Sequence, residues 1–301
     1  MRRTRPPERA EMTAPAIREL TPAALQAMPL PAPGTSKEDR GRLCVVGGSV
    51  QVPGAALLAA EAALRAGAGK LQIATVRSCA TALGVAVPEA LVIGLPEDAT
   101  GEIAPGSPAL QAALDQCDAV LVGPGMRPTP FLTRLTARLH QMKATVVLDA
   151  GALNGGVCAG AGAPFILTPH AGEMAFMCGG RKEDVERSPL EHAIKMARAT
   201  SSVVVLKGPR TLIVAPDGEA WLHEGGGPGL GTSGSGDALA GLITGFAARG
   251  ATPMEAAVWG VWTHGEAGRL LAGSVGPLGF LAREISLQVP GILQRFNCED
   301  R

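Results

Sequence analysis

The chain has 301 residues, 46% of them hydrophobic, which is normal for a globular protein with a sizeable core. Its 27 basic side chains balance 27 acidic ones, and no segment is dominated by Lys and Arg. Together with only 3% aromatic residues, this argues against nucleic acid or an anionic membrane as the main partner.

The cysteine pattern and the N-terminus indicate a reduced, cytoplasmic compartment. None of the six cysteines forms a CxxC pair or has a histidine at metal-ligand spacing. No apolar stretch follows the N-terminal arginines, so we expect no signal peptide. No run approaches the roughly 18 apolar residues that a membrane span needs.

In chain order, residues 1–34 are expected to be a partly disordered N-terminal extension. Within it, Thr21 and Pro22 are typical of a helix start, as N-cap and first helical residue. We expect a single catalytic domain over residues 35–290, because no repeat or composition break divides it, and a tail over residues 291–301.

Apolar runs alternate with helical segments through this domain. Short apolar runs predict strands at 43–46, 71–75, 119–122, 145–148, 165–167 and 202–206, a hairpin of 211–214 with 220–222, and helices at 54–66, 236–248 and 253–271. Strands that are apolar throughout, interleaved with helices, predict an α/β fold with a mostly parallel central sheet and helices on both faces.

The strongest motif is the glycine-rich segment that ends in Gly234-Ser235-Gly236-Asp237 and leads into a helix. The first amides of a helix have no intrahelical partner and attract phosphate. A carboxylate at Asp237 would not improve phosphate affinity, so we interpret it as a general base for a hydroxyl that attacks phosphorus. The alternative is that Asp237 only caps the helix.

Three further motifs follow predicted strands, at the edge of an α/β sheet where ligands bind. Each could also be structural: His170 a hydrogen-bonded residue, Lys207 a solvated lysine, and Asp149 a helix cap or a carboxylate for Mg²⁺. The motifs are Asp149-Ala150-Gly151-Ala152-Leu153-Asn154, Thr168-Pro169-His170-Ala171-Gly172-Glu173 and Lys207-Gly208-Pro209-Arg210-Thr211.

Over roughly residues 35–270 the motifs resemble, in order, those of the ADP-dependent NAD(P)H-hydrate dehydratase family. Thr168-Pro-His-x-x-Glu173 together with Gly234-x-Gly-Asp237 is specific, whereas the second string alone indicates only a ribokinase-like protein. The remaining strings are Gly41 to Ser49, Pro53 to Ala56, Ala66 to Gly69, Val122-Gly123-Pro124-Gly125, Leu148 to Asn154, Lys207 to Thr211 and Asp237 to Gly241.

The resemblance implies a ribokinase-like fold and repair of hydrated NADH or NADPH, in which ADP phosphorylates the added hydroxyl and phosphate then leaves. It implies Mg²⁺ at the phosphates and a homo-oligomer. By this resemblance Asp237 is catalytic. Substrate contacts are expected at Ala55, Gly123, Gly125, His170 and Asp237, nucleotide contacts at Lys207, Gly208, Pro209, Arg210, Thr211, Gly234, Ser235 and Gly236, and metal or substrate contacts at Asp149, Asn154 and Glu173.

Some positions depart from the family pattern. The family usually has a second Asp where this chain has Gly151, Asn where Gly227 stands, and Ser-His-Lys where residues 35–37 read Thr-Ser-Lys. Two other functions therefore stay open: a ribokinase-like kinase for a sugar, a thiazole or a pyrimidine, and a nucleotide-binding relative with impaired catalysis.

Overall fold

The computed structural model describes residues 16–153 and 165–297. They contain one sheet of ten strands in the order β1-β10-β9-β8-β7-β6-β5-β2-β3-β4. The strands are β1 (Ile17–Glu19), β2 (Arg42–Val46), β3 (Lys70–Val76), β4 (Ala90–Leu95), β5 (Ala119–Val122), β6 (Thr145–Leu148), β7 (Phe165–Leu167), β8 (Val203–Leu206), β9 (Arg210–Val214) and β10 (Ala220–Glu224).

Strands β2 to β8 are mutually parallel, and β10 pairs in parallel with β1; only β9 runs antiparallel to both of its neighbours, β8 and β10. In the register, Val122 lies beside both Val46 and Leu148, and Leu148 lies beside Leu167. The carboxyl ends of these strands therefore share one edge. The predicted mostly parallel sheet is confirmed.

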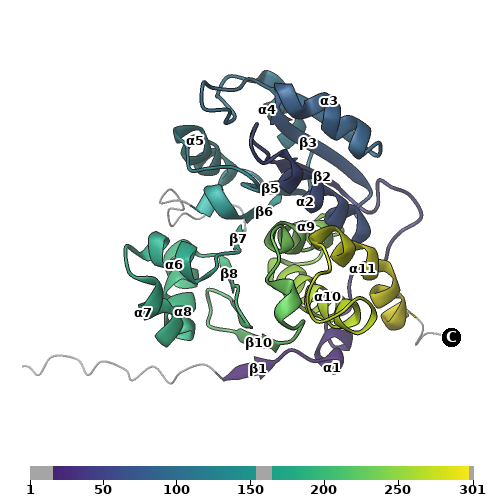
Figure 1. The fold of residues 1–301 in the computed structure, drawn as a ribbon, viewed down its shortest axis with the longest axis vertical. Coiled ribbons are helices and arrows are strands. Elements are labelled where there is room, and N and C mark those ends of the chain that lie inside the picture. Colours follow the sequence, from purple (N-terminus) through teal and green to yellow (C-terminus); the bar gives the residue numbers. More distant parts are fainter. Residues whose placement is uncertain (1–15, 154–164, 298–301) are drawn as a thin grey trace, which may run out of the picture.

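Helices cover both faces of the sheet (Figure 1). Helices α2, α9, α10 and α11 pack on one face, and α4 to α8 pack on the other. The helices are α1 (Pro22–Gln26), α2 (Pro53–Arg65), α3 (Arg77–Ala86), α4 (Pro108–Leu114), α5 (Pro130–Leu139), α6 (Ala171–Cys178), α7 (Lys182–Arg187), α8 (Pro189–Thr200), α9 (Ser235–Ala248), α10 (Pro253–Ser274) and α11 (Ala282–Asn297), with the short 3-10 helices η1 (Ala150–Leu153) and η2 (Pro228–Leu230).

Each central strand contributes to two hydrophobic cores because successive side chains point to opposite faces. In β2, Leu43 and Val45 belong to the core beneath α9 and α10, whereas Cys44 and Val46 belong to the opposite core. All four side chains are fully buried. A strand covered on both faces must be apolar at every position, and this explains the continuous apolar runs in the sequence.

The predicted elements agree with the structure to within a few residues. The strands at 119–122, 145–148 and 165–167 have the expected bounds, and the hairpin of β9 and β10 is present. Two strands were not predicted. Strand β1 is short and exposed, so it carries no apolar run, and β4 lies at the edge of the sheet with Leu91 exposed.

The described part of the N-terminal extension packs on the domain. Strand β1 pairs with β10, Leu25 of α1 is fully buried, and the indole of Trp259 donates to the carbonyl oxygen of Met28 at 2.7 Å. At the other end, α11 continues beyond residue 290 into the predicted tail. Within residues 16–153 and 165–297, no helix combines the length and apolarity needed to cross a bilayer.

Candidate active site

The predicted site residues follow the carboxyl ends of parallel strands. Asp149 follows β6, His170 follows β7 and Lys207 follows β8, and these strands are neighbours in the sheet. His170 and Lys207 also form an isolated parallel bridge beyond the strand ends. The motifs that follow β6, β7 and β8 are thus brought together, as expected of a ligand edge.

Lys207 is held by a buried carboxylate. Its ammonium lies 2.8 Å from Oδ1 of Asp149, which also accepts a hydrogen bond from the hydroxyl of Thr168 at 2.8 Å. Nζ of Lys207 is 3.9 Å from Oε2 of Glu173. Burial lowers the pKa of Lys207, but Asp149, Glu173 and Asp237 outweigh it and raise the pKa overall. Lys207 is therefore a fixed cation and not a solvated lysine.

Helix α6 begins with a capping box made by two predicted site residues. Nδ1 of His170 accepts the backbone N–H groups of Gly172 and Glu173, and the Glu173 carboxylate accepts the N–H of His170 at 2.8 Å. His170 therefore has the structural, hydrogen-bonded role that the sequence left open. Its side chain is nevertheless 59% exposed and faces the large cavity described below.

Asp237 is the third residue of α9, and it does not cap the helix. The N-cap is Gly234, which has no side-chain hydrogen bond and adopts a left-handed conformation at φ 88°. Burial and the neighbouring Asp149 raise the pKa of Asp237 from 3.8 to about 6, although Lys207 opposes the shift. A carboxylate with this pKa is still ionised at neutral pH and is basic enough to accept a proton.

The start of α9 forms a cationic, donor-rich end of the site. A Cβ built on Gly236 would lie only 3.3 Å from Nζ of Lys207, so the ammonium sits directly against the first turn. The first backbone N–H groups of the helix have no intrahelical acceptor, and the helix dipole adds partial positive charge. This arrangement can bind phosphate oxygens.

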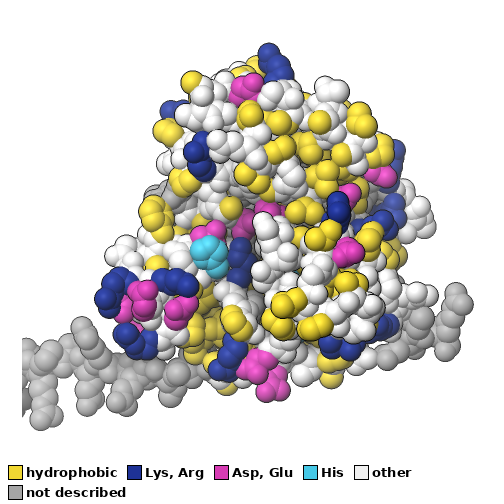
Figure 2. All heavy atoms as spheres, viewed as in Figure 1, with side chains coloured by type: hydrophobic (Ala, Val, Ile, Leu, Met, Phe, Trp, Pro, Cys, Tyr) yellow, Lys and Arg dark blue, Asp and Glu magenta, His cyan; other side chains and the backbone are white. Residues whose placement is uncertain are grey.

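A cavity of about 910 Å³ opens in front of α9. Figure 2 shows histidine, basic and acidic side chains gathered near the middle of the face, beside α6 and α9 as placed in Figure 1. The cavity is large enough for a nucleotide. Of the predicted nucleotide contacts, Lys207, Gly208, Pro209, Thr211, Ser235 and Gly236 line it.

Gly234 and Arg210 are the two predicted nucleotide contacts outside the cavity lining. The side chain of Arg210 is 69% exposed and pairs with Glu224. The side chain of residue 210 on β9 points away from the cavity because neighbouring positions of a strand face opposite ways. Asn154 lies outside the described residues.

Two of the predicted substrate contacts, Ala55 and Gly125, lie where the loop after β5 meets the start of α2. Gly125 has φ 66°, and a Cβ there would lie 2.4 Å from the carbonyl oxygen of Val52 and 2.8 Å from the Cβ of Ala55. Only glycine combines this conformation with so close an approach. The loop after β5 is therefore packed against the start of α2, and one turn further along, Leu58 meets Gly234 at the start of α9.

Gly151 has no room for a side chain in this structure. A Cβ at Gly151 would lie 2.4 Å from the carbonyl oxygen of Met126, so an aspartate there would require the 126–127 backbone to move. Arg127 in turn binds the buried carboxylate of Glu102 through its backbone N–H at 3.2 Å and its Nε at 3.0 Å. The loop is thus held close to Gly151 in this chain.

Three side chains of the site were not singled out from the sequence. Thr168 was quoted only as part of a motif, and His223 and His264 lie on β10 and α10, far along the chain from the other motifs. Both histidines line the large cavity, and burial lowers the pKa of each. A lone histidine in an apolar helix or hairpin carries no pattern by which sequence reasoning could find it.

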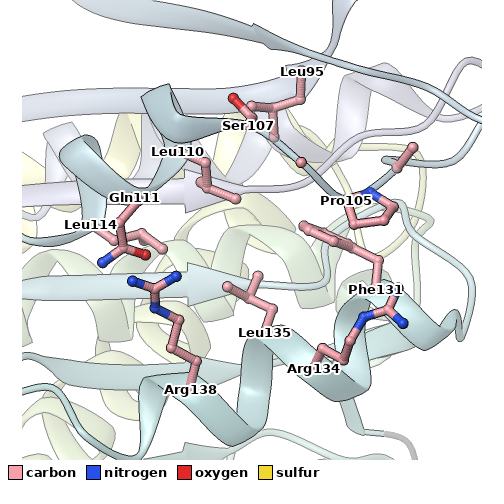
Figure 3. A pocket seen from close by; sticks show the side chains of 12 residues that line it. Leu95, Pro105, Ser107, Leu110, Gln111, Leu114, Phe131, Arg134, Leu135 and Arg138 are labelled. Carbon is pink, nitrogen blue, oxygen red and sulfur yellow. The ribbon is translucent and has the colours of Figure 1, made fainter.

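A second, smaller cavity of about 170 Å³ lies between α4 and α5. Figure 3 shows Leu110, Phe131 and Leu135 facing one another, with Arg134 and Arg138 at the rim. It contains none of the predicted site residues and no carboxylate or histidine. None of the site residues predicted from the sequence therefore falls in this cavity.

The fold, with these polar residues at the carboxyl ends of its parallel strands, is that of a ribokinase-like protein. A ribokinase-like superfamily protein from Enterococcus faecalis superposes with a TM-score of 0.79 at 26% identity, over 93% of this chain and 96% of that one. An NAD(P)H-hydrate dehydratase from Bacillus subtilis, described as ADP/ATP-dependent and co-crystallised with ATP and Mg²⁺, has a TM-score of 0.82 at 29% identity, over 93% and 99%.

The sequence comparisons identify the family. The family profile described as NAD(P)H-hydrate dehydratase matches residues 43–290. An ADP-dependent (S)-NAD(P)H-hydrate dehydratase from Xanthomonas campestris is 56% identical over 285 residues, which cover 94% of this chain and 99% of that protein. The chain belongs to the NAD(P)H-hydrate dehydratase family. It spans about half the length of the bifunctional repair enzymes that it also matches.

Proposed function

We propose that the chain is an ADP-dependent (S)-NAD(P)H-hydrate dehydratase that restores hydrated NADH or NADPH. The observation that carries this proposal is the Asp237 carboxylate, with a pKa of about 6, beside the ammonium of Lys207 at the start of α9. It places a base next to a phosphate-binding helix end. The family membership and the name of the Xanthomonas campestris relative support the same reaction.

Asp237 acts in the first step. It accepts the proton of the hydroxyl on the hydrated nicotinamide ring as that oxygen bonds to the β-phosphorus of ADP, while the bond to the α-phosphate oxygen breaks and AMP leaves. Hydroxide is a poor leaving group, whereas phosphate is a good one. The ring nitrogen lone pair then expels phosphate, and loss of a proton from the adjacent ring carbon restores the double bond.

Lys207 and the first turn of α9 stabilise the charge that develops during this transfer. The ammonium is kept in place by Asp149, and its raised pKa keeps it charged at neutral pH, where Asp237 is ionised. The backbone N–H of Gly236, which has no backbone acceptor in the described structure, adds a fixed donor on the same side. Donors that are already oriented stabilise a transition state without having to reorganise.

Magnesium would be held mainly by the nucleotide phosphates. Within residues 16–153 and 165–297, no cluster of three or more His, Cys, Asp or Glu side chains is placed to hold a metal alone. Asp149 is occupied by Lys207 and Thr168, and Asp237 is the base, so Glu173 would supply the protein oxygen. Such a set suits Mg²⁺, which favours phosphates and one or two carboxylates. When bound, the ion neutralises phosphate charge.

We place the adenine nucleotide in the large cavity. Its floor carries the phosphate-binding residues, and Pro228, Leu239 and Val261 supply apolar surface for a purine. The nicotinamide part would lie toward Ala55 and Gly125, on the other side of Asp237. Direct transfer of the β-phosphoryl group from ADP to the ring hydroxyl needs the two substrates to lie on opposite sides of one carboxylate.

The test is recovery of the near-ultraviolet absorbance of the dihydronicotinamide ring from hydrated NADH or NADPH, with Mg²⁺ and ADP or ATP. We expect nucleotide-dependent recovery by the wild type and a loss of at least about 100-fold in Asp237→Asn, the usual scale for removing a general base. Phosphorylation of free sugar, thiazole or pyrimidine alcohols in place of recovery would establish the kinase alternative. Nucleotide binding without any turnover would establish the impaired relative.

We further propose a cytoplasmic location and a homo-oligomer. Exposed apolar side chains gather near the C-terminal helix at Val275, Leu278, Leu281 and Leu287. Sedimentation of the purified protein tests the second proposal: a mass near 30.6 kDa at micromolar concentration would contradict it.

A further inference from the structure

A buried contact joins the phosphate-binding turn to the long helix α10. Nε2 of His264 lies 2.9 Å from the hydroxyl oxygen of Ser235 and 3.1 Å from its backbone carbonyl oxygen. Ser235 is the first residue of α9 and is 5% exposed. His264 and Ser235 both line the large cavity. The reaction described above assigns no role to His264.

The two contacts favour one tautomer of His264. A carbonyl oxygen can only accept, so the 3.1 Å contact is a hydrogen bond only when Nε2 carries the hydrogen. The Nε2–H is then shared between the carbonyl and the hydroxyl oxygen of Ser235. Because that hydroxyl oxygen is used as an acceptor, its own hydrogen is free to be donated elsewhere, and the adjacent cavity is where a phosphate would lie.

We propose that His264 is a positioning residue of the nucleotide site, whose Nε2–H orients Ser235 so that the serine hydroxyl donates to a phosphate oxygen of the nucleotide. This inference rests on the proposed function, since it requires a nucleotide in the large cavity. Ser235 then contributes its hydroxyl as a donor to the phosphate, while its backbone N–H donates to the carbonyl oxygen of Thr232 at 3.2 Å. His264 itself does not touch the nucleotide phosphate.

The same geometry excludes a serine nucleophile. In a Ser–His pair that activates serine, the imidazole nitrogen accepts the hydroxyl proton, whereas here that nitrogen is a donor. Burial lowers the pKa of His264 to about 4, although its hydrogen bond to the Ser235 backbone opposes this, and the nearby His223 and Lys207 lower it further. The imidazole is therefore neutral at neutral pH.

The contact matters because the segment before Ser235 supplies little rigidity of its own. Residues 225–236 include seven glycines, and Gly234 itself has a left-handed backbone conformation. Glycine-rich backbone has many accessible conformations. By contrast, α10 is a long helix with a capping box at its start. A hydrogen bond from α10 fixes the donor geometry that the glycines leave free.

The experiment measures ADP affinity by calorimetry with Mg²⁺, in the full chain, for variants at His264 and its neighbour. His264→Leu removes the donor, and His264→Gln keeps an N–H donor at similar reach. Thr263→Val is the matched control, because the Thr263 hydroxyl is buried on the same helix turn without a hydrogen-bond partner in the described structure. Ser235→Ala and the double variant with His264→Leu complete a double-mutant cycle.

We expect about tenfold weaker ADP binding for His264→Leu and for Ser235→Ala, the scale of one lost hydrogen bond to a charged group. His264→Gln should recover most of the loss, and Thr263→Val should bind ADP like the wild type. The double variant should bind no more than about threefold more weakly than Ser235→Ala, since the two residues act through one hydroxyl.

Additive losses of about 100-fold in the double variant would overturn the proposal. So would normal ADP affinity in a folded His264→Leu protein, or loss of affinity in step with a lowered melting temperature that Thr263→Val shares. A wild type that binds ADP but does not restore hydrated NADH would refute the proposed function alone. The binding measurements would still decide the role of His264.

Discussion

The ionised carboxylate of Asp237, which the proposed reaction requires, should lower the stability of the folded protein. Its pKa is raised from 3.8 to about 6, first by burial and then by repulsion from Asp149. Each tenfold change in acidity is worth about 1.4 kcal/mol, so the interval from 3.8 to about 6 corresponds to about 3 kcal/mol. This is the free energy that the folded protein loses when Asp237 ionises.

Asp237→Asn removes the charge while keeping the shape of the side chain. Well below pH 3.8 the wild-type carboxyl is protonated in both the folded and the unfolded state, and the two proteins should be equally stable. As the pH rises from 3.8 to about 6, the wild type loses folding stability, because the carboxyl of the unfolded chain ionises first. At pH 8 the variant should therefore be more stable by about 3 kcal/mol, while its dehydratase activity is lost.

The assay is chemical unfolding of both proteins at about pH 4.5 and about pH 8, values on either side of the folded-state pKa of about 6, between which most of the stability difference should appear. The difference between variant and wild type is compared at the two pH values, so effects of other titrating groups cancel. A variant that is less stable than the wild type at pH 8, or a stability difference that does not change with pH, would refute the reasoning. Dehydratase activity of the wild type that falls about tenfold for each pH unit below about 6 would support the reasoning.

Three other variants test the surroundings of this carboxylate. Lys207→Met leaves Asp149 buried without its cation, so we expect a loss of about 3–5 kcal/mol in unfolding free energy together with weaker nucleotide binding by calorimetry. Glu102→Ala frees Arg127 and the loop that holds Gly125, so the KM for hydrated NADH should rise several-fold while ADP affinity is unchanged; equal effects on both substrates would contradict this. Gly125→Ala forces a side chain into a left-handed position 2.4 Å from a carbonyl oxygen, and we expect more than about 2 kcal/mol of destabilisation in thermal unfolding; wild-type stability would show that the loop is not constrained.

The sequence alone determined the fold class, because the signal for it is local. Runs such as Ala119–Val122 and Thr145–Leu148 are apolar throughout, and this is required only of strands covered on both faces. The glycine-rich approach to Asp237 was recognisable for the same reason, since a helix start that binds phosphate is built from consecutive residues. Short edge strands such as β1 (Ile17–Glu19) left no such trace, because partners from distant sequence decide whether they form.

The tertiary structure decided what each polar residue does. From the sequence, Lys207 could equally have been a solvated lysine, and only the fold places it 2.8 Å from Asp149, from a strand 58 residues away along the chain. The raised pKa of Asp237 depends on burial and on Asp149, which no local pattern encodes. The contact between Ser235 and His264 likewise exists only because α9 and α10 pack together. Residue types and their spacing specify local structure, whereas distances, burial and charge between distant segments arise only when the chain folds.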